Sequence, residues 1–267
     1  MKTSLIISTY NRPDALALCL ESVKRQTLLP DEVIVGDDGS RDETKQLIER
    51  FQKDFPVPLI HVWQEDDGFR LAMCRNKCIA KAKHEYIIQV DGDVILHTRF
   101  VEDHVASAQR GYYIKGGRVN IERKRTEKLC HELKYVPLSF LSWGLSRREN
   151  AIHCLPLAKY LAPRRKTRPG LGCNMSFWKD DLVQVNGYDE FYVGWGGEDY
   201  DLSIRLLNVG RKNLALKFAA IVFHLWHEDK HMQNRKKNFD YYHEKVAERA
   251  TWCAKGLDQY LKNGQEN

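Results

Sequence analysis

The chain has 267 residues, of which 43% are hydrophobic and 29% are charged, so it can bury one sizeable core. No stretch approaches the roughly 20 consecutive apolar residues that span a bilayer, and residues 1–7 enter a strand pattern without a signal-like cleavage site. The seven cysteines form no CxxC pair, which excludes a zinc knuckle of that type and argues against a disulfide framework. We therefore expect reduced thiols and a cytoplasmic location.

Basic residues are concentrated in the middle of the chain. The formal net charge is +6, and between residues 110 and 168 lysines and arginines far outnumber the four acids. Such a segment is usually a solvated face. It also favours an anionic partner, such as a phosphate-bearing acceptor, an acidic polysaccharide or a lipid surface.

The first hundred residues alternate β-branched runs with helical patterns. Strands are expected at 3–9, 32–36, 59–63 and 86–90, and helices from Pro13 onward, at 43–51 and at 71–83. This alternation predicts a Rossmann-like α/β fold, with a mostly parallel sheet covered by helices on both faces. Ligands of such sheets bind at the carboxyl ends of the strands.

Three of these strands end in polar residues, at 8–11, 37–40 and 91–93. Because parallel strands bring their carboxyl ends to one edge, all three segments should line one crevice. Asp91 and Asp93 can hold a hard divalent cation there, although paired aspartates are also common turn formers. Asp38 can accept hydrogen bonds from a base or a ribose, and Asp42 can cap the next helix. Neither GxGxxG nor GxxxxGK[ST] is present, which excludes Rossmann dinucleotide and P-loop sites.

The pattern is less regular after Asp93. We expect a helix near 99–109, a strand at 112–119, loops and short helices in the basic region, and a returning strand at 173–178. A helix at 202–209, a strand at 214–224 and one or two helices over 234–260 complete the chain. We expect one domain over 1–267, with a first half at 1–120, a basic variable insertion at 121–170, and a second half with a C-terminal helix at 171–267.

The segment from Gly194 to Asp201 combines three carboxylates and an indole with glycines. Glycines allow sharp bends, so Trp195 can lie over a flat ligand while Glu198 and Asp199 point into the same cleft. These acids would also favour the N-terminus of the following helix through its dipole. The combination predicts a polyol-binding site that contains a base.

These segments, in this order, resemble the family 2 glycosyltransferases. The matching residues are Ser8-Thr9-Tyr10-Asn11-Arg12-Pro13, Asp37-Asp38-Gly39-Ser40, Arg75-Asn76 and Asp91-Gly92-Asp93. The downstream segment from Gly194 to Asp199 is similar to the acceptor and base segment of animal β-1,4-galactosyltransferases and bacterial chondroitin-polymerase-type enzymes. The resemblance covers roughly residues 3–120 and 172–228, and it implies a GT-A fold.

The resemblance also implies roles for single residues. Asp38 would read the uracil or ribose of a UDP-sugar, and Arg75 would lie near the diphosphate or sugar. Asp93 would be the main aspartate ligand of Mn²⁺ or Mg²⁺, and Asp91 would contact ribose or sugar. Asp199 would be the catalytic base, and Glu198 would hold acceptor hydroxyls. The remaining residues would surround the nucleotide (Thr9, Tyr10, Arg12), form a sugar platform (Trp195) or supply the histidine ligand (His224 or His227, with His224 ranked first).

The function implied is inverting, metal-dependent transfer of a hexose or N-acetylhexosamine from a UDP-sugar to a glycan hydroxyl, which gives a β-linkage. The acceptor would be a bacterial surface polysaccharide, lipopolysaccharide or other glycolipid, anionic in keeping with the basic segment and reached by peripheral association with the inner face of the membrane. A nucleotidyltransferase would also use paired aspartates and a metal, but it leaves the tryptophan and paired glycines before Glu198 unexplained. A basic nucleic-acid-binding protein is the non-enzymatic alternative, and no recognised binding module supports it.

Overall fold

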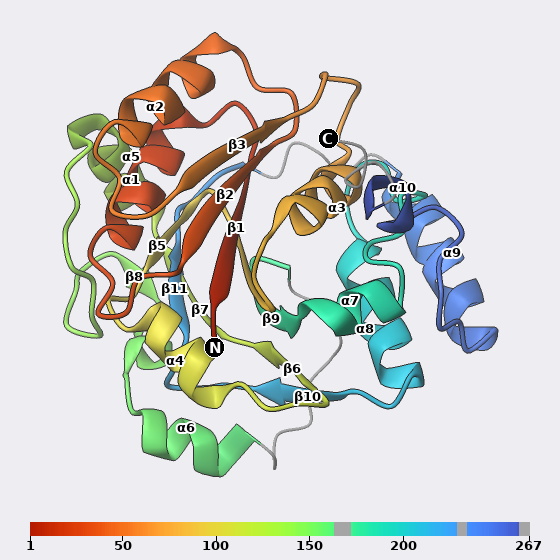
Figure 1. Cartoon of the computed structure of the whole chain (residues 1–267). Coiled ribbons are helices and arrows are strands. Elements are labelled where there is room, and N and C mark those ends of the chain that lie inside the picture. The colour runs from red at the N-terminus through yellow and green to blue at the C-terminus, as the bar shows by residue number, and fades with distance from the viewer. Residues whose placement is uncertain (163–171, 229–233, 262–267) are drawn as a thin grey trace.

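The computed structural model describes residues 1–162, 172–228 and 234–261, and a seven-stranded sheet lies at its centre (Figure 1). The strand order is β10-β6-β9-β4-β1-β2-β3. Neighbours are parallel except where β9 pairs antiparallel with β4 and β6. The bounds of these strands are β1 Thr3–Thr9, β2 Glu32–Asp37, β3 Leu59–Trp63, β4 Tyr86–Asp91, β6 Tyr112–Lys115, β9 Asn174–Trp178 and β10 Lys212–Ala215.

Helices cover both faces of this sheet because its strands are apolar on both sides. Leu5 and Ile7 of β1 pack in one core with helices α1 and α2, whereas Ile6 points into a second core with α3 and α8. Such continuously buried strands are typical of parallel sheets. The helices are α1 Pro13–Val23, α2 Asp42–Gln52, α3 Leu71–Lys81, α4 Phe100–Ser107, α7 Lys179–Gln184 and α8 Glu198–Asn208. The expected mixed, mainly parallel α/β fold is therefore confirmed.

A second, smaller sheet was not expected from the sequence. It has the strand order β5-β11-β7-β8. The strands are β5 Val94–Leu96, β7 Gly117–Ile121, β8 Leu145–Ser146 and β11 Ile221–His224. Its apolar residues pack against Ala15 and Leu18 of α1, so this sheet is held close to the carboxyl ends of β1 and β4.

Two predicted strands, 112–119 and 214–224, were wrong as single strands, because each is divided between the two sheets. The first divides at Gly116, where an added Cβ would collide with the Asn174 side chain and the Ala220 carbonyl. The second divides at Phe218 and Ala220, whose φ angles of 71° and 49° turn the chain out of the extended conformation. Neither the hydrophobic periodicity of a segment nor its strand propensity indicates that the chain passes from one sheet to the other.

The remaining elements lie in the basic region and at the C-terminal end. They are α5 Arg123–Glu132, the 3₁₀ helix η1 Arg148–Ala151, α6 Leu155–Leu161, α9 Arg235–Ala247 and α10 Asp258–Leu261. Residues 163–170 of the predicted basic insertion lie outside the described residues. The C-terminal segment forms two helices, one of the two arrangements expected. Asp42 is the first residue of α2 rather than its cap, which is Arg41, so the predicted capping role was wrong.

All seven cysteines are free. Cys74 and Cys78 of α3 face Gly36 of β2, where an added Cβ would lie 2.6 Å from the sulfur of Cys78. Their spacing of one helical turn therefore reflects close packing of a helix on a strand. Among the described residues, no helix has the length and apolar character needed to cross a bilayer.

Candidate active site

Asp93, His224 and His227 come together at the junction of the two sheets. Asp93 lies between β4 and β5, and the antiparallel pairing of β11 with β5 sets His224 opposite Val94. His224 Nε2 is 3.5 Å from Asp93 Oδ1, and His227 Nε2 is 3.3 Å from Asp93 Oδ2. The three ligand atoms all lie within 4.8 Å of one another. The sequence did not decide between His224 and His227, and the structure places both histidines next to Asp93.

The chemistry of this cluster suits a divalent metal. Burial raises the pKa of Asp93, against the opposing effects of His227 and Arg12, and leaves Oδ1 without a hydrogen bond among the described residues. Burial lowers the pKa of His224 to about 3, so its imidazole is neutral and can offer a lone pair. One carboxylate and two imidazoles match the oxygen and nitrogen ligands used by Mn²⁺ and similar ions.

Arg75 joins the aspartates of β4 to the acids of α8. Its side chain is 1% exposed, and its guanidinium lies 3.0 Å from Asp91 Oδ1, 2.9 Å from Asp199 Oδ1 and 3.6 Å from Glu198 Oε1. Burial works to lower the pKa of Arg75, but Asp199, Tyr188, Asp91 and Glu198 together raise it well above its ordinary value. Arg75 is therefore a buried cation surrounded by three carboxylates. Any contact between Arg75 and a substrate would be made from this buried, paired position.

Asp199 is held in place by three donors. Its Oδ1 accepts hydrogen bonds from Arg75 and, at 3.3 Å, from the Tyr188 hydroxyl, while Oδ2 accepts one of 2.8 Å from the backbone N–H of Gly172. Three donors suit an anionic carboxylate. A Cβ on Gly172 would collide with this carboxylate, so a glycine is needed at that position.

Glu198 is the first residue of α8 and is buried beside Asp199. Burial and the Asp199 charge raise the pKa of Glu198 to about 8, and Arg75 only partly offsets them. The two adjacent acids therefore have different environments. Asp199 receives three hydrogen bonds, whereas Glu198 lies in a desolvated position 3.6 Å from the Arg75 guanidinium. Both acids lie in the first turn of α8, where the helix dipole favours negative charge.

Asp38 is buried in the turn that follows β2. It accepts hydrogen bonds from the Arg70 backbone N–H at 2.9 Å and from the Gln64 side chain at 2.5 Å. Burial raises the pKa of Asp38 to about 6, although these two donors oppose the shift. Its partners come from the segment that follows β3, so Asp38 anchors that segment at the strand ends.

The remaining crevice residues divide into two groups. Thr9 is buried, and its carbonyl accepts the Asp38 N–H, while the Tyr10 hydroxyl donates to Asp66 at 3.0 Å. Arg12 instead lies beside Asp93, with its guanidinium 3.4 Å from Asp93 Oδ2. The structure thus places Thr9 and Tyr10 near Asp38, and Arg12 near Asp93.

Trp195 lies on a tight turn that packs against α9. Gly194, Gly196 and Gly197 all have positive φ, between 84° and 100°, which side chains rarely adopt. The Asn238 side chain donates to the carbonyl of Trp195 at 3.3 Å. The indole is 38% exposed, with the Arg235 guanidinium 5.3 Å from the ring. Trp195 therefore remains available on the surface next to the acids of α8.

Several residues of the site were missed by sequence reasoning. Arg118 of β7 lies near Asp93 and His224, where its charge contributes to the lowered pKa of His224 and opposes the raised pKa of Asp93. Tyr188 and Gly172 hold Asp199, and Asn76 donates to the Tyr188 carbonyl at 2.8 Å. None of them belongs to a periodic pattern, and only Asn76 was quoted in a motif.

A second group, His97, Asp103 and His153, also has ligand atoms within 4.8 Å of one another. The two imidazole rings are stacked, with centroids 4.7 Å apart and planes 12° apart. A metal about 2.1 Å from a ring nitrogen lies in the plane of that ring, and one ion cannot lie in both stacked planes. Asp103 is instead bonded to His153 at 3.0 Å and to the Ala220 N–H at 2.8 Å, so this group is a structural network.

Two protein-family models match this chain. The family model described as glycosyl transferase family 2 matches residues 4–156, and a model described as the N-terminal domain of galactosyltransferase matches residues 156–238. The chain belongs to glycosyl transferase family 2. The two matches meet near residue 156, between the half that carries Asp93 and the half that carries Asp199.

Curated relatives of this family 2 domain include synthases of polysaccharides. It is 28% identical over 229 residues to the hyaluronan synthase of Pasteurella multocida and 26% identical over 223 residues to the chondroitin synthase of Escherichia coli, with 78% of the chain covered in each case. It is 29% identical over 220 residues to a validoxylamine A glucosyltransferase of Streptomyces hygroscopicus subsp. limoneus, with 76% covered. The matches span 23%, 32% and 47% of these relatives' own lengths.

Solved structures confirm the GT-A fold. Residues 1–349 of S. aureus TarS in complex with UDP-GlcNAc match with a TM-score of 0.64 at 18% identity, covering 98% of this chain and 71% of that one. GalNAc-T7 with UDP, GalNAc and Mn²⁺ matches with a TM-score of 0.65 at 17% identity, covering 100% and 54%. The chain therefore contains a glycosyltransferase domain of the GT-A fold.

The raised pKa of Glu198 predicts a pH-dependent stability. A carboxyl group whose pKa rises from 4.5 to about 8 on folding binds more protons in the folded than in the unfolded protein between those pH values. Its contribution to the free energy of unfolding therefore falls as pH rises from about 5 to about 8. We expect Glu198→Gln, which cannot ionise, to gain thermal stability relative to wild type over this range.

Thermal unfolding of both proteins at a series of pH values measures this difference. Glu127→Gln, at an exposed glutamate of α5, is the matched control and should follow the wild-type curve. A constant difference between wild type and Glu198→Gln across the range would contradict the assignment.

Proposed function

We propose that this chain is an inverting, metal-dependent glycosyltransferase that moves a hexose or N-acetylhexosamine from a UDP-sugar to a glycan hydroxyl. The observation that carries the proposal is the Arg75 contact between Asp91, which ends β4, and the acids that begin α8. Through this one side chain, the proposed donor and metal side of the site is joined to the two acids proposed for the acceptor side, Glu198 and Asp199. The donor half (1–120) and the acceptor half (171–267) would act as one domain, with 121–170 as a basic insertion.

On the donor side, Asp93, His224 and His227 would hold Mn²⁺ or Mg²⁺. When bound, the cation would supply Lewis-acid stabilisation of the negative charge on the departing diphosphate. Arg12 and Arg118, both next to Asp93, would contact the same phosphates. Asp38, Thr9 and Tyr10 would form the nucleoside end, and Asp91 would contact the ribose or the sugar.

On the acceptor side, Asp199 would take the proton from the attacking hydroxyl, and Glu198 would hold acceptor hydroxyls. The three donors around Asp199 support this choice, since they fix the orientation of an anionic carboxylate. Attack on the face opposite to the departing UDP inverts the anomeric configuration and gives a β-linked product from an α-linked donor. Trp195 would stack on a sugar ring.

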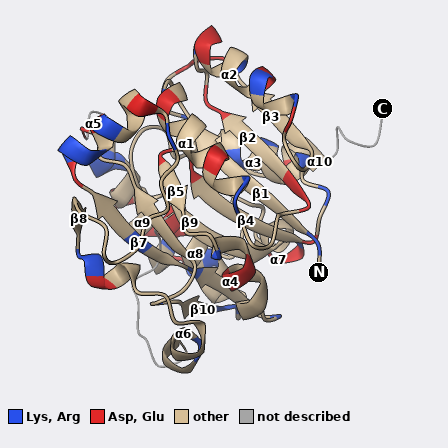
Figure 2. Ribbon diagram, turned by 90° about the vertical axis from the view of Figure 1, so that its left-hand side faces the viewer, with Lys and Arg blue, Asp and Glu red and all other residues tan. Residues whose placement is uncertain are grey.

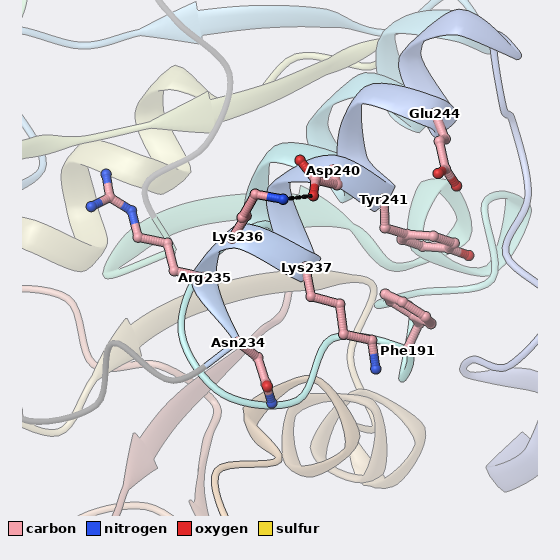
Figure 3. A pocket seen from close by; sticks show the side chains of 8 residues that line it. All are labelled: Phe191, Asn234, Arg235, Lys236, Lys237, Asp240, Tyr241 and Glu244. Carbon is pink, nitrogen blue, oxygen red and sulfur yellow. Dashed lines mark hydrogen bonds and ion pairs between the residues drawn. The ribbon is translucent and has the colours of Figure 1, made fainter.

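An anionic glycan is the acceptor that the surface beside Trp195 favours. The first turn of α9 exposes Arg235, Lys236 and Lys237, which line an open pocket of about 740 Å³ together with two acids, Asp240 and Glu244 (Figure 3). Arg235 also lies over Trp195, and so connects this pocket to the acceptor side. Lys236 pairs with Asp240, whereas Lys237 lies 5.0 Å from the centroid of Phe191. An acceptor with a carboxylate or phosphate would find cations here. Bacterial surface polysaccharide or lipopolysaccharide fits this chemistry.

The donor reaction is tested with a panel of UDP-sugars. We expect Mn²⁺-dependent release of UDP from one or a few of them, and Asp93→Ala should reduce this release to the rate measured without metal, because it removes a ligand from the cluster. Asp54→Ala, at an exposed carboxylate after α2, is the control and should behave as wild type. Release of pyrophosphate from nucleoside triphosphates instead would favour a nucleotidyltransferase and contradict the proposal.

The base assignment makes a separate prediction. Asp199→Asn should keep UDP affinity within about twofold, measured by titration calorimetry, and should reduce transfer by about 10²–10⁴-fold, the range for loss of a general base. Gly172→Ala should act in the same direction, because its Cβ displaces the Asp199 carboxylate. Unchanged turnover in Asp199→Asn would rule out Asp199 as the base.

The acceptor pocket is tested by replacing its cations. The double variant Arg235→Gln/Lys237→Gln should weaken binding of a chondroitin oligosaccharide about thirtyfold, since each of the two lost charge contacts is worth about 1 kcal/mol. The carboxyl-reduced form of the same oligosaccharide should bind wild type and variant equally. Lys245→Gln, on the same helix but outside the pocket, is the control. Equal effects on both oligosaccharides would contradict an anionic acceptor here.

A further inference from the structure

Large apolar side chains are exposed together on the segment that joins α5 to β8. The exposed fractions are 52% for Leu133, 46% for Phe140, 77% for Leu141 and 55% for Trp143. Three of these four residues lie within four positions of the chain. Clusters of this kind mark binding surfaces, whereas single exposed apolar residues are ordinary. We refer to Leu133, Phe140, Leu141 and Trp143 as the apolar tip.

The exposure of the apolar tip is fixed by hydrogen bonds at its base. The Ser142 N–H donates to the Ser139 carbonyl at 2.9 Å, and the Ser139 N–H donates to the Ser142 hydroxyl at 3.1 Å. Arg125 is buried, donates to the Trp143 carbonyl and lies 5.0 Å from the Trp143 ring centroid. These bonds close a turn that directs Phe140 and Leu141 outward. The segment is therefore shaped to present apolar side chains.

Exposed cations flank the apolar tip along the chain. Figure 2 shows lysines and arginines gathered on α5 and next to β8, on the same edge of the molecule. Within the described part of the chain, four exposed cations of this edge form no ion pair with a carboxylate: Lys124, Lys134, Arg147 and Arg148. The glutamates of α5 are occupied, since Arg123 pairs with Glu127 and Lys128 with Glu132.

This edge borders the metal cluster. The Arg123 guanidinium lies 4.6 Å from the Trp226 ring centroid, and the backbone N–H of Trp226 donates to the Thr126 hydroxyl at 2.9 Å. Trp226 lies in sequence between His224 and His227, which flank Asp93. The first two turns of α5 are therefore in direct contact with the segment that carries the candidate metal ligands.

We propose that the apolar tip and the cations around it dock the enzyme on the surface of an anionic phospholipid bilayer. Tryptophan, leucine and phenylalanine would enter the boundary between headgroups and acyl chains, and the cations would contact lipid phosphates. Charge complementarity selects this occupant, because protein interfaces are depleted in lysine, whereas membrane-binding surfaces combine lysine and arginine with such apolar groups. The benefit to catalysis rests on the proposed transfer to a lipid-linked glycan, but the docking itself does not.

Co-sedimentation with vesicles tests the docking. We expect wild type to bind vesicles of equal parts phosphatidylcholine and phosphatidylglycerol and to be released by high salt, with much weaker binding to phosphatidylcholine alone. Leu141→Ser/Trp143→Ser should reduce the partition coefficient about tenfold or more, as expected for loss of buried apolar area. Lys134→Gln/Arg148→Gln should reduce it about fivefold for each cation removed, and only on anionic vesicles.

Two variants outside this edge are matched controls. Trp252→Ser removes a tryptophan that is 51% exposed near the C-terminal end, and Lys45→Gln removes an exposed cation of α2. Both should bind vesicles as wild type does. All variants should keep the thermal stability of wild type and bind UDP equally, which shows that they are folded.

Three results would overturn the proposal: no preference of wild type for anionic vesicles, equal losses in the controls, or loss of self-association in Leu141→Ser/Trp143→Ser with unchanged vesicle binding. The last result, measured by light scattering, would assign the apolar tip to a protein interface. Failure of the proposed transfer reaction is a separate outcome, because vesicle binding is measured without donor or acceptor.

Discussion

The buried guanidinium of Arg75 is the interaction on which the rest of the site depends. It is the cation that three carboxylates from two distant parts of the chain share, 16 positions away at Asp91 and 124 positions away at Asp199. Removing Arg75 would leave these carboxylates without their shared cation, which is strongly destabilising. The Arg75 contacts therefore fix the position of the N-terminus of α8 relative to the end of β4, and with it the separation between the two halves of the site.

The junction of the two sheets provides the second constraint. β11 pairs with β5 in a register that sets His224 beside Asp93, and the Leu225 N–H donates to the Asp93 carbonyl at 2.9 Å. Backbone pairing, rather than the side chains alone, thus holds His224 next to Asp93. Burial lowers the pKa of His224, which keeps that imidazole neutral, and raises the pKa of Asp93, so a bound cation would stabilise the carboxylate.

The elements that sequence predicted well are those whose pattern is local. The buried runs of β1, β2 and β4, and the proline at the start of α1, are each determined by a few neighbouring residues, and the structure has them within about two residues. The strands over 112–119 and 214–224 were predicted less well. Their division depends on which sheet each half joins. For 112–119 that choice depends on Asn174 and the Ala220 carbonyl, far away in the sequence, and for 214–224 it follows the change of backbone direction at Phe218 and Ala220.

For the site, the sequence by itself determined the chemical groups: the paired aspartates, the histidines and the acids after the glycine-rich turn, because these form short motifs. The tertiary structure alone decided their partners. It placed Arg75 between Asp91 and Asp199, Arg12 beside Asp93, and Gly172 under the Asp199 carboxylate. The physical reason is that pKa values and hydrogen bonds depend on burial and on distances between residues that the chain brings together only when both sheets have formed.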